Sequence, residues 1–171
     1  MRLQIKAKIL CFFGMVTLLV GCGFHLRGGV EFPEEYKTAY ISSNEPDFSR
    51  DGVAFYLQRQ LRSQLGFVTN EASADLIISI DESYDTRVIA SSQGGALREY
   101  TSNLQARITV VDANGRVLFP AETFTRSQDY SLNEQAPLAK ATAEDEIKGE
   151  SAEELSRAFI RRLTTVIRAG K

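Results

Sequence analysis

The fold is decided by the stretch Tyr100-Thr101-Ser102-Asn103-Leu104-Gln105-Ala106-Arg107-Ile108-Thr109-Val110-Val111. From Leu104 onward, residues alternate between apolar and polar up to Val110. This period of two predicts a strand with one buried face and one polar face. The next residues, Asp112-Ala113-Asn114-Gly115, predict a hairpin turn in which glycine supplies a positive φ. The sequence therefore predicts an antiparallel hairpin in the middle of the chain.

The segments around this hairpin predict the other strands. The return strand is expected from about Arg116 to Tyr130. Pro120 within it indicates an edge position or a bulge, because proline has no N–H to donate to a ladder. Residues 74–81 alternate in the same way, and that strand can extend to Ile89. Residues 37–43 predict the first strand.

Two amphipathic helices are predicted outside the hairpin. Residues 49–65 carry an apolar residue at every fourth position from Val53, and we expect Gly66 to be the helix C-cap. Residues 136–168 carry a second stripe of this kind. The segment Ser151-Ala152-Glu153-Glu154 fits a capping box. Gly149 is therefore either a break before a new helix or a tolerated glycine, and both alternatives stay open.

The element order predicts an α+β fold, an α/β sandwich of order β-α-β-β-β-α. Two amphipathic helices are expected on one face of a four-stranded mixed, mostly antiparallel sheet, because this arrangement buries both apolar stripes. The first strand is joined through a helix, so it can run parallel to a neighbour. We expect a partner to bind on the other face of the sheet.

The N-terminal segment has the pattern of a lipoprotein signal peptide. Three basic residues precede a short apolar run over residues 9–20, and Cys22 follows Gly21. The run is shorter than the roughly 20 residues that a transmembrane helix needs. An ordinary signal peptide with an incidental cysteine is the alternative interpretation. We expect cleavage before Cys22, whose thiol would then carry a lipid.

Processing at this position predicts the domain organisation. Residues 1–21 form the signal peptide, residues 22–36 form a lipidated tether, and residues 37–171 form a single domain. The other cysteine, Cys11, would be lost with the signal peptide, so no disulfide is expected in the mature chain.

Composition argues against nucleic-acid binding. The chain has 20 basic and 22 acidic residues, and three of the basic ones lie in the signal peptide. The mature chain therefore carries a formal charge of −5, whereas nucleic-acid-binding proteins are usually basic. Any anionic ligand must be held by a local cluster of cations.

The residues needed for common catalytic sites are missing from the sequence. His25 is the single histidine and lies three residues from the expected lipidation site, so a serine or cysteine nucleophile has no histidine base. Metal-ligand spacing and phosphate-binding glycine loops are also absent. Glu144-Asp145-Glu146 are consecutive and predict a solvated helix face. We therefore expect a non-enzymatic protein with no metal and no cofactor.

The segment Cys22-Gly23-Phe24-His25-Leu26-Arg27-Gly28 resembles the start of mature lipoproteins of the LptE, or LPS-assembly, family. The Glu99-Tyr100 entry to the long strand and Leu138-Ala139-Lys140 before the last helix agree with it. The resemblance implies a non-catalytic outer-membrane lipoprotein. Such a protein plugs the LptD β-barrel and assists its assembly, and it binds lipopolysaccharide for insertion into the outer leaflet.

The resemblance also implies site residues. Lys140 matches the start of the last helix, where the family binds lipopolysaccharide. The loop after Ile89 has no cation where relatives can present an arginine, so Arg98 or Arg87 could replace it. The residues that would face the barrel are Thr101, Asn103, Gln105 and Arg107. Each of the seven candidate site residues named in this paragraph could instead be an ordinary solvated surface residue.

The resemblance to bacterial lipoproteins also implies where the protein is located in the cell envelope. Aspartate after the lipidated cysteine favours retention in the inner membrane, so Gly23 indicates the outer membrane, with the domain on the periplasmic side. A second hypothesis is an outer-membrane lipoprotein that binds and activates a peptidoglycan-synthesising enzyme. A third is a lipid-anchored hydrolase, for which the sequence offers no catalytic constellation.

Overall fold

The structure, a computed structural model, describes residues 32–44, 50–92, 97–133 and 137–169. The predicted signal peptide, Cys22 and most of the predicted tether lie outside these residues. The elements are β1 (Thr38–Ser43), α2 (Val53–Leu61), β2 (Gly66–Phe67), η2 (Glu71–Ser73), β3 (Leu76–Ser91), β4 (Leu97–Asp112), β5 (Val117–Asn133) and α3 (Pro137–Ala169). Within the described residues, no helix is both long and apolar enough to span a bilayer.

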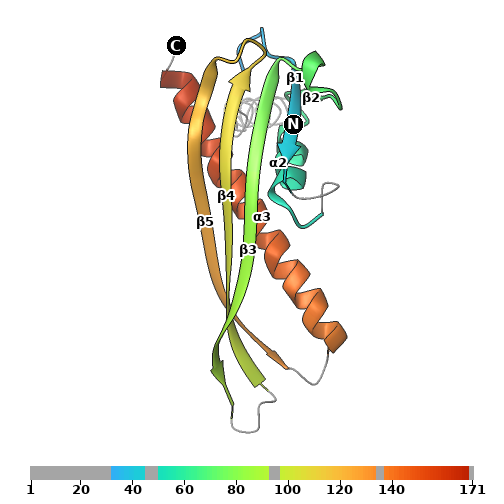
Figure 1. Cartoon of the computed structure of the whole chain (residues 1–171), viewed down its shortest axis with the longest axis vertical. Helices are drawn as coiled ribbons and strands as arrows, with labels where there is room; N and C mark the ends of the chain where they lie inside the picture. Colours follow the sequence, from blue (N-terminus) through green and yellow to red (C-terminus); the bar gives the residue numbers. More distant parts are fainter. Residues whose placement is uncertain (1–31, 45–49, 93–96, 134–136, 170–171) are drawn as a thin grey trace, which may run out of the picture.

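The predicted α+β architecture is confirmed, with one strand more than expected. The sheet has the order β2-β1-β3-β4-β5, in which β1 is parallel to β2 and β3, and β3, β4 and β5 are antiparallel. Figure 1 shows both helices behind one face of this long, twisted sheet. The extra strand, β2, has two residues and pairs with the free edge of β1.

The predicted end of the first helix is wrong. The helix α2 stops at Leu61, with Arg62 as its C-cap, and Gly66 begins β2. The reason is competition from the edge of β1: the Gly66 N–H donates to the Lys37 carbonyl at 2.8 Å. The chain therefore leaves the helix early to extend the sheet.

Pro120 has both features that its residue type predicted. It lies in β5, the edge strand of the sheet. The register jumps there, because Val110 on β4 pairs with Phe119 while Ile108 pairs with Glu122. One extra residue on β5 makes a bulge, which removes the need for a proline N–H in the ladder.

The helix α3 runs without a break through Gly149, so the predicted capping box does not start a helix. Ser151 instead lies buried within the helix. Gly149 is placed against α2: a Cβ built on it would lie 3.0 Å from the Tyr56 hydroxyl. Glycine is tolerated in the helix interior because it lets the two helices approach closely.

The apolar core fills one half of the molecule. Phe119 on β5 packs edge-on against Phe159 on α3, with 5.2 Å between ring centroids. The large, fully buried side chains around this pair come from both helices and from β3 and β4: Leu57, Leu61, Leu76, Ile78, Leu104, Ile108 and Leu163. The predicted apolar face of the central strand is thus confirmed as the helix-covered face of the sheet.

The two ends of the molecule differ in their composition. The tether end contains the β4–β5 turn and the C-terminal end of α3 (Figure 1). Tyr36 lies there too, because its hydroxyl accepts a hydrogen bond from Arg116 in that turn. The tip contains the ends of β3 and β4 that flank residues 93–96, with the first turns of α3 nearby. The strands β3 and β4, of 16 residues each, carry the sheet well past the apolar core to the tip.

Candidate functional site

Lys140 is held at the tip by an aromatic pair. Its Nζ donates to the Tyr100 hydroxyl at 3.1 Å and lies 5.0 Å from the centre of that ring. Tyr100 stacks on Tyr130 of β5, with 5.4 Å between ring centroids and 14° between ring planes. The cation therefore lies between α3 and the sheet, over a surface that attracts positive charge.

The other two predicted cations lie on different sides of the sheet. Arg98 is two residues before Tyr100 on β4, so strand alternation places it on the helix side with Lys140. Arg87 pairs in register with Thr101 on the outer side and binds Asp85, with Nε 3.1 Å from Oδ2. The structure places Lys140 and Arg98 on one side and Arg87 on the other.

Exposed apolar side chains accompany these cations. Val88, Ile89 and Leu97 at the tip are 50%, 54% and 48% exposed. The register shift between Val88 and Ala90 lies at the end of β3, in the same place. No site was predicted at these residues from the sequence. The sequence does carry an indication of them: these apolar residues flank a Ser/Gly-rich segment, and polar residues are more common beside such segments.

Farther from the tip, Lys148 of α3 contacts both the segment before α2 and the strand β3. Lys148 pairs with Asp51, with 3.2 Å between Nζ and Oδ2, and lies 5.9 Å from the Tyr84 ring centre. Burial raises the pKa of the Tyr130 phenol above its usual value of 10.0. The phenol is therefore neutral near pH 7 and supplies no charge to the site.

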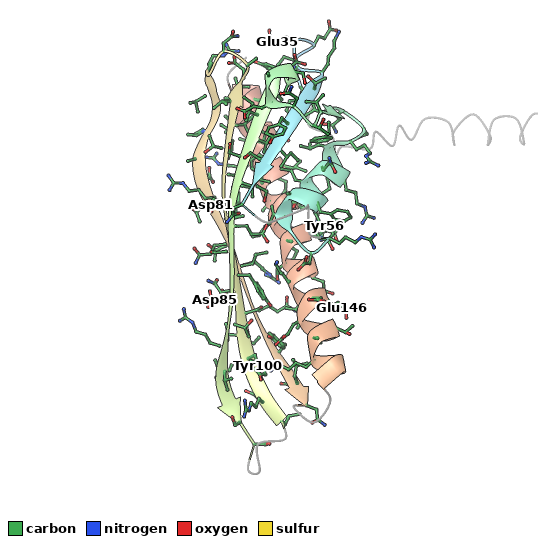
Figure 2. The ribbon with its side chains drawn as sticks, turned by 45° about the vertical axis from the view of Figure 1, so that its right-hand side comes forward. Glu35, Tyr56, Asp81, Asp85, Tyr100 and Glu146 are labelled. Carbon is green, nitrogen blue, oxygen red and sulfur yellow. The ribbon has the colours of Figure 1, made fainter. Side chains whose placement is uncertain are left out.

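The four predicted barrel-facing residues share the outer face of the sheet. Thr101 donates to Asp129 on β5, and Asn103 contacts Asp85 on β3 at 3.3 Å and Ser127 on β5 at 3.0 Å. Gln105 and Arg107 occupy the next two rows of β4 on the same face. Figure 2 shows Asp81 and Asp85 directed away from α3, on this outer side. Both helices lie on the opposite face, so these rows stay open to a polar partner or to water.

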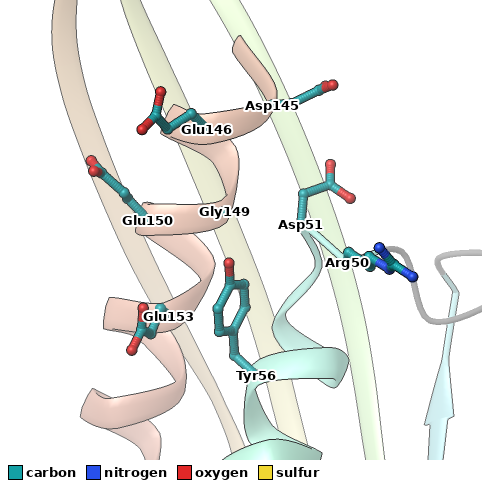
Figure 3. Close-up of a pocket in the computed structure, with 8 residues that line it drawn as sticks. All are labelled: Arg50, Asp51, Tyr56, Asp145, Glu146, Gly149, Glu150 and Glu153. Carbon is teal, nitrogen blue, oxygen red and sulfur yellow. The ribbon is translucent and has the colours of Figure 1, made fainter. Parts of the chain in front are cut away.

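An open groove of about 440 Å³ lies between the start of α2 and α3. Figure 3 shows its lining residues: Arg50, Asp51, Tyr56, Asp145, Glu146, Gly149, Glu150 and Glu153. Four of its acidic side chains, Asp145, Glu146, Glu150 and Glu153, come from successive turns of α3, and Asp51 lies just before α2. In the described part of the chain, no group of three or more histidine, cysteine or acidic residues could hold a metal ion.

Comparison with known proteins agrees with this architecture. The model of the family LptE, described as lipopolysaccharide-assembly, matches residues 36–163. The LPS-assembly lipoprotein LptE of Photorhabdus laumondii is 30% identical, over all of this chain and 91% of the relative. The protein of the same name from Pectobacterium atrosepticum is 28% identical, over 88% of this chain and 81% of the relative.

Two solved structures share the fold. The uncharacterized lipoprotein B from Nitrosomonas europaea superposes with a TM-score of 0.62 at 23% identity, covering 86% of this chain and 94% of that one. The minor lipoprotein from Acinetobacter baumannii gives a TM-score of 0.54 at 13% identity, covering 76% of this chain and 94% of that one. The family match covers most of the chain, and the whole-length relatives carry one name. The chain therefore belongs to the LptE family of lipopolysaccharide-assembly lipoproteins.

Proposed function

We propose that this chain is a non-catalytic outer-membrane lipoprotein that plugs the LptD β-barrel, assists its assembly and binds lipopolysaccharide for insertion into the outer leaflet. Family membership supports the general role in lipopolysaccharide transport. The observation that carries the finer proposal is the tip, where cations and exposed apolar side chains occur together.

The chemistry of the tip fits a phosphorylated lipid. Lipid A carries phosphate groups on a sugar backbone and several acyl chains. Lys140, Arg98 and Arg87 supply the positive charge that phosphates require, and arginine can bind phosphate in a bidentate way. Val88, Ile89 and Leu97 supply an apolar surface for acyl chains. Because the tip is only three strands wide, one large lipid can contact cations on both faces.

The outer face of the sheet is the proposed contact with the barrel wall. The lumen of an outer-membrane barrel is polar. Thr101, Asn103, Gln105 and Arg107 present hydrogen-bonding groups on a face that both helices leave open. A polar plug of this kind meets the lumen without burying unpaired apolar surface.

The proposed anchor is an acyl-modified Cys22 in the outer membrane, with the domain on the periplasmic side. The apolar run before Cys22 and the glycine after it support this proposal. Two or more acyl chains give stable attachment, whereas a single chain gives marginal binding.

The test is detergent extraction of the tagged full chain from a Gram-negative host, followed by mass identification of what accompanies it. We expect a large β-barrel, and an N-terminal peptide whose mass shows acylated Cys22. Gln105→Trp should reduce the recovered barrel, while the bulky Glu146→Trp on the far side of α3 should not. Recovery of a peptidoglycan-synthesising enzyme without a barrel would instead support the second hypothesis of the sequence analysis.

A further inference from the structure

A second open groove, of about 410 Å³, lies along the seam between α2 and α3. It shares one lining residue, Glu153, with the acidic groove of Figure 3. The basic groove is defined by the other polar residues that line it: Gln60 of α2, Gln64 just after α2, and Arg157 and Arg161 of α3. The seam between the two helices therefore changes from acidic to basic with distance from the tip.

The two arginines of the basic groove are available to a partner. They lie one turn apart on the same side of α3, and both are exposed. Within the part of the chain that the structure describes, the Arg161 guanidinium has no acidic partner within 4 Å. Arg157 has one exposed pairing, with 3.6 Å between its Nη1 and Glu153 Oε1. Such a pair contributes little in water, so both guanidinium groups can bind another carboxylate.

The two glutamines add uncharged hydrogen-bonding groups to the basic groove. Gln60 Nε2 and Gln64 Oε1 are shielded from solvent, and neither has a hydrogen-bond partner among the described residues. Shielded polar atoms are normally paired, so an unpaired donor near an unpaired acceptor is unusual. A peptide group offers both an acceptor and a donor. It can pair with both side chains once each amide rotates about its last side-chain bond.

A polypeptide segment fits this seam better than an anionic lipid surface does. The neighbouring acidic groove carries Asp51, Glu146 and Glu150 among its lining residues, and a uniformly anionic surface along the seam would be repelled there. A polypeptide can instead place acidic side chains at Arg157 and Arg161 alone. Loops that fold into the lumen are common in outer-membrane barrels, so a plug can meet barrel polypeptide on its helical face as well.

We propose that the basic groove binds an acidic loop segment of the barrel polypeptide. Carboxylates of the loop bind Arg157 and Arg161, and its backbone pairs with the amides of Gln60 and Gln64. The inference rests on the plug function proposed above, and it assigns the barrel a second contact, on the face of the domain opposite the polar sheet surface. Arginine can hold a carboxylate through two parallel hydrogen bonds, which gives the contact a defined orientation.

The experiment uses the full tagged chain, isolated in detergent together with the barrel, and a water-soluble carbodiimide. This reagent joins a lysine amine to a carboxylate in direct contact with it. Arg161→Lys therefore turns the proposed contact into an amide bond that peptide mass spectrometry can locate. We expect the introduced lysine to be joined to an aspartate or glutamate of the barrel. Arg162→Lys is the positive control, because Arg162 contacts Glu122 of the same chain, with 3.1 Å between Nε and Oε2.

A charge variant tests whether the contact helps to hold the complex together. Arg157→Gln with Arg161→Gln should lower the recovery of the barrel at moderate salt by roughly fivefold, since two exposed ion pairs are lost. Arg59→Gln with Arg62→Gln is the matched control, because these arginines are exposed but do not line the basic groove, and barrel recovery should stay near that of the natural chain. High salt should remove the difference between the two double variants.

The outcomes separate this proposal from the plug function. If the barrel is recovered and Arg162→Lys is joined to Glu122, but the lysine at position 161 is joined to nothing or only to its own chain, the proposal is overturned and the plug function stands. A bond to a polypeptide other than the barrel would overturn it as well, and so would equal barrel recovery by the two double variants. A complex that contains no barrel would overturn both proposals.

Discussion

The Glu82 carboxylate on β3 accepts a hydrogen bond from the backbone N–H of Val53, the first residue of α2, with 2.8 Å between Oε2 and N. The N-cap residue, Gly52, has no side chain that could do this. Glu82 is 4% exposed, and its own backbone is bound in both directions by the Asn44 amide, at 2.7 and 2.8 Å. The start of α2 is thus capped by a strand distant in sequence. A negative charge is also favourable at a helix N-terminus.

Glu82→Ala removes this cap and leaves a buried N–H without its acceptor. We expect the free energy of unfolding to fall by about 1–3 kcal/mol, as measured by urea denaturation. Asp81→Ala is the matched control, because Asp81 is the exposed neighbour on the same strand, and its effect should stay within about 0.5 kcal/mol. Equal effects of the two substitutions would show that the cap contributes nothing.

Gly149→Ala tests the close approach of the helices. Alanine is favoured over glycine by about 1 kcal/mol in a helix interior. The added Cβ would lie 3.0 Å from the Tyr56 hydroxyl, so crowding should offset this gain in the natural chain. In a Tyr56→Phe background the oxygen is absent, and the gain of about 1 kcal/mol should appear in urea denaturation. If Gly149→Ala changes the free energy of unfolding equally in both backgrounds, crowding against the Tyr56 hydroxyl does not offset the gain.

Asp75 makes stability depend on pH. The backbone N–H of Lys37, together with the hydroxyl and N–H of Thr38, holds the pKa of Asp75 below its usual value of 3.8. The unfolded chain therefore binds more protons at low pH, and the stabilisation present near pH 7 is lost as the pH falls through about 4 and below.

Asp75→Asn should accordingly lower the free energy of unfolding near neutral pH and flatten its decline between about pH 5 and pH 2. Thr38→Val removes one of the donors and should give an intermediate slope. Urea denaturation across this pH range measures the slopes. Parallel curves for Asp75→Asn and the natural chain would mean that another group controls the acid sensitivity.

Ile89→Ser tests the apolar part of the proposed lipid site. Ile89 is 54% exposed, so its removal should cost little stability. We expect lipopolysaccharide affinity to fall about tenfold, from the loss of roughly 1–1.5 kcal/mol of apolar burial on binding. The control is Val117→Ser, because Val117 is 57% exposed but lies at the other end of the sheet. A similar loss in both variants, in a direct binding assay, would assign the effect to something other than the tip.

Lys140→Asp tests the charge at the tip. The substitution reverses a cation that the Tyr100 ring and hydroxyl position, and should weaken lipopolysaccharide binding by at least about tenfold, since charged hydrogen bonds contribute about 1.5–3 kcal/mol. Tyr100→Phe keeps the cation and the ring but removes the hydroxyl, so most of the affinity should remain. The fold and the recovery of the barrel should be unchanged in both. Undiminished binding by Lys140→Asp in an assay with purified lipopolysaccharide would remove Lys140 from the site.

The end of α2 and the continuation of α3 through Ser151 differ from the predictions for a common physical reason. The end of α2 was predicted from the apolar stripe within residues 49–65, but the edge of β1 competes for the residues around Gly66. The capping box at Ser151 is a local signal, but packing against α2 continues the helix through it. In both cases a contact with a segment distant in the chain outweighed a local preference.

The sequence by itself determined the alternation of the long strands, the two amphipathic helices and the proline at a bulged edge, because these patterns depend on neighbours along the chain. The tertiary structure alone decided which cations share a side of the sheet. Arg98 and Lys140 fall on the helix side and Arg87 on the outer side, because strand register and the crossing of α3 set these positions. It also decided that Val88, Ile89 and Leu97 stay exposed, since the sheet extends to the tip beyond the core that would otherwise have buried them.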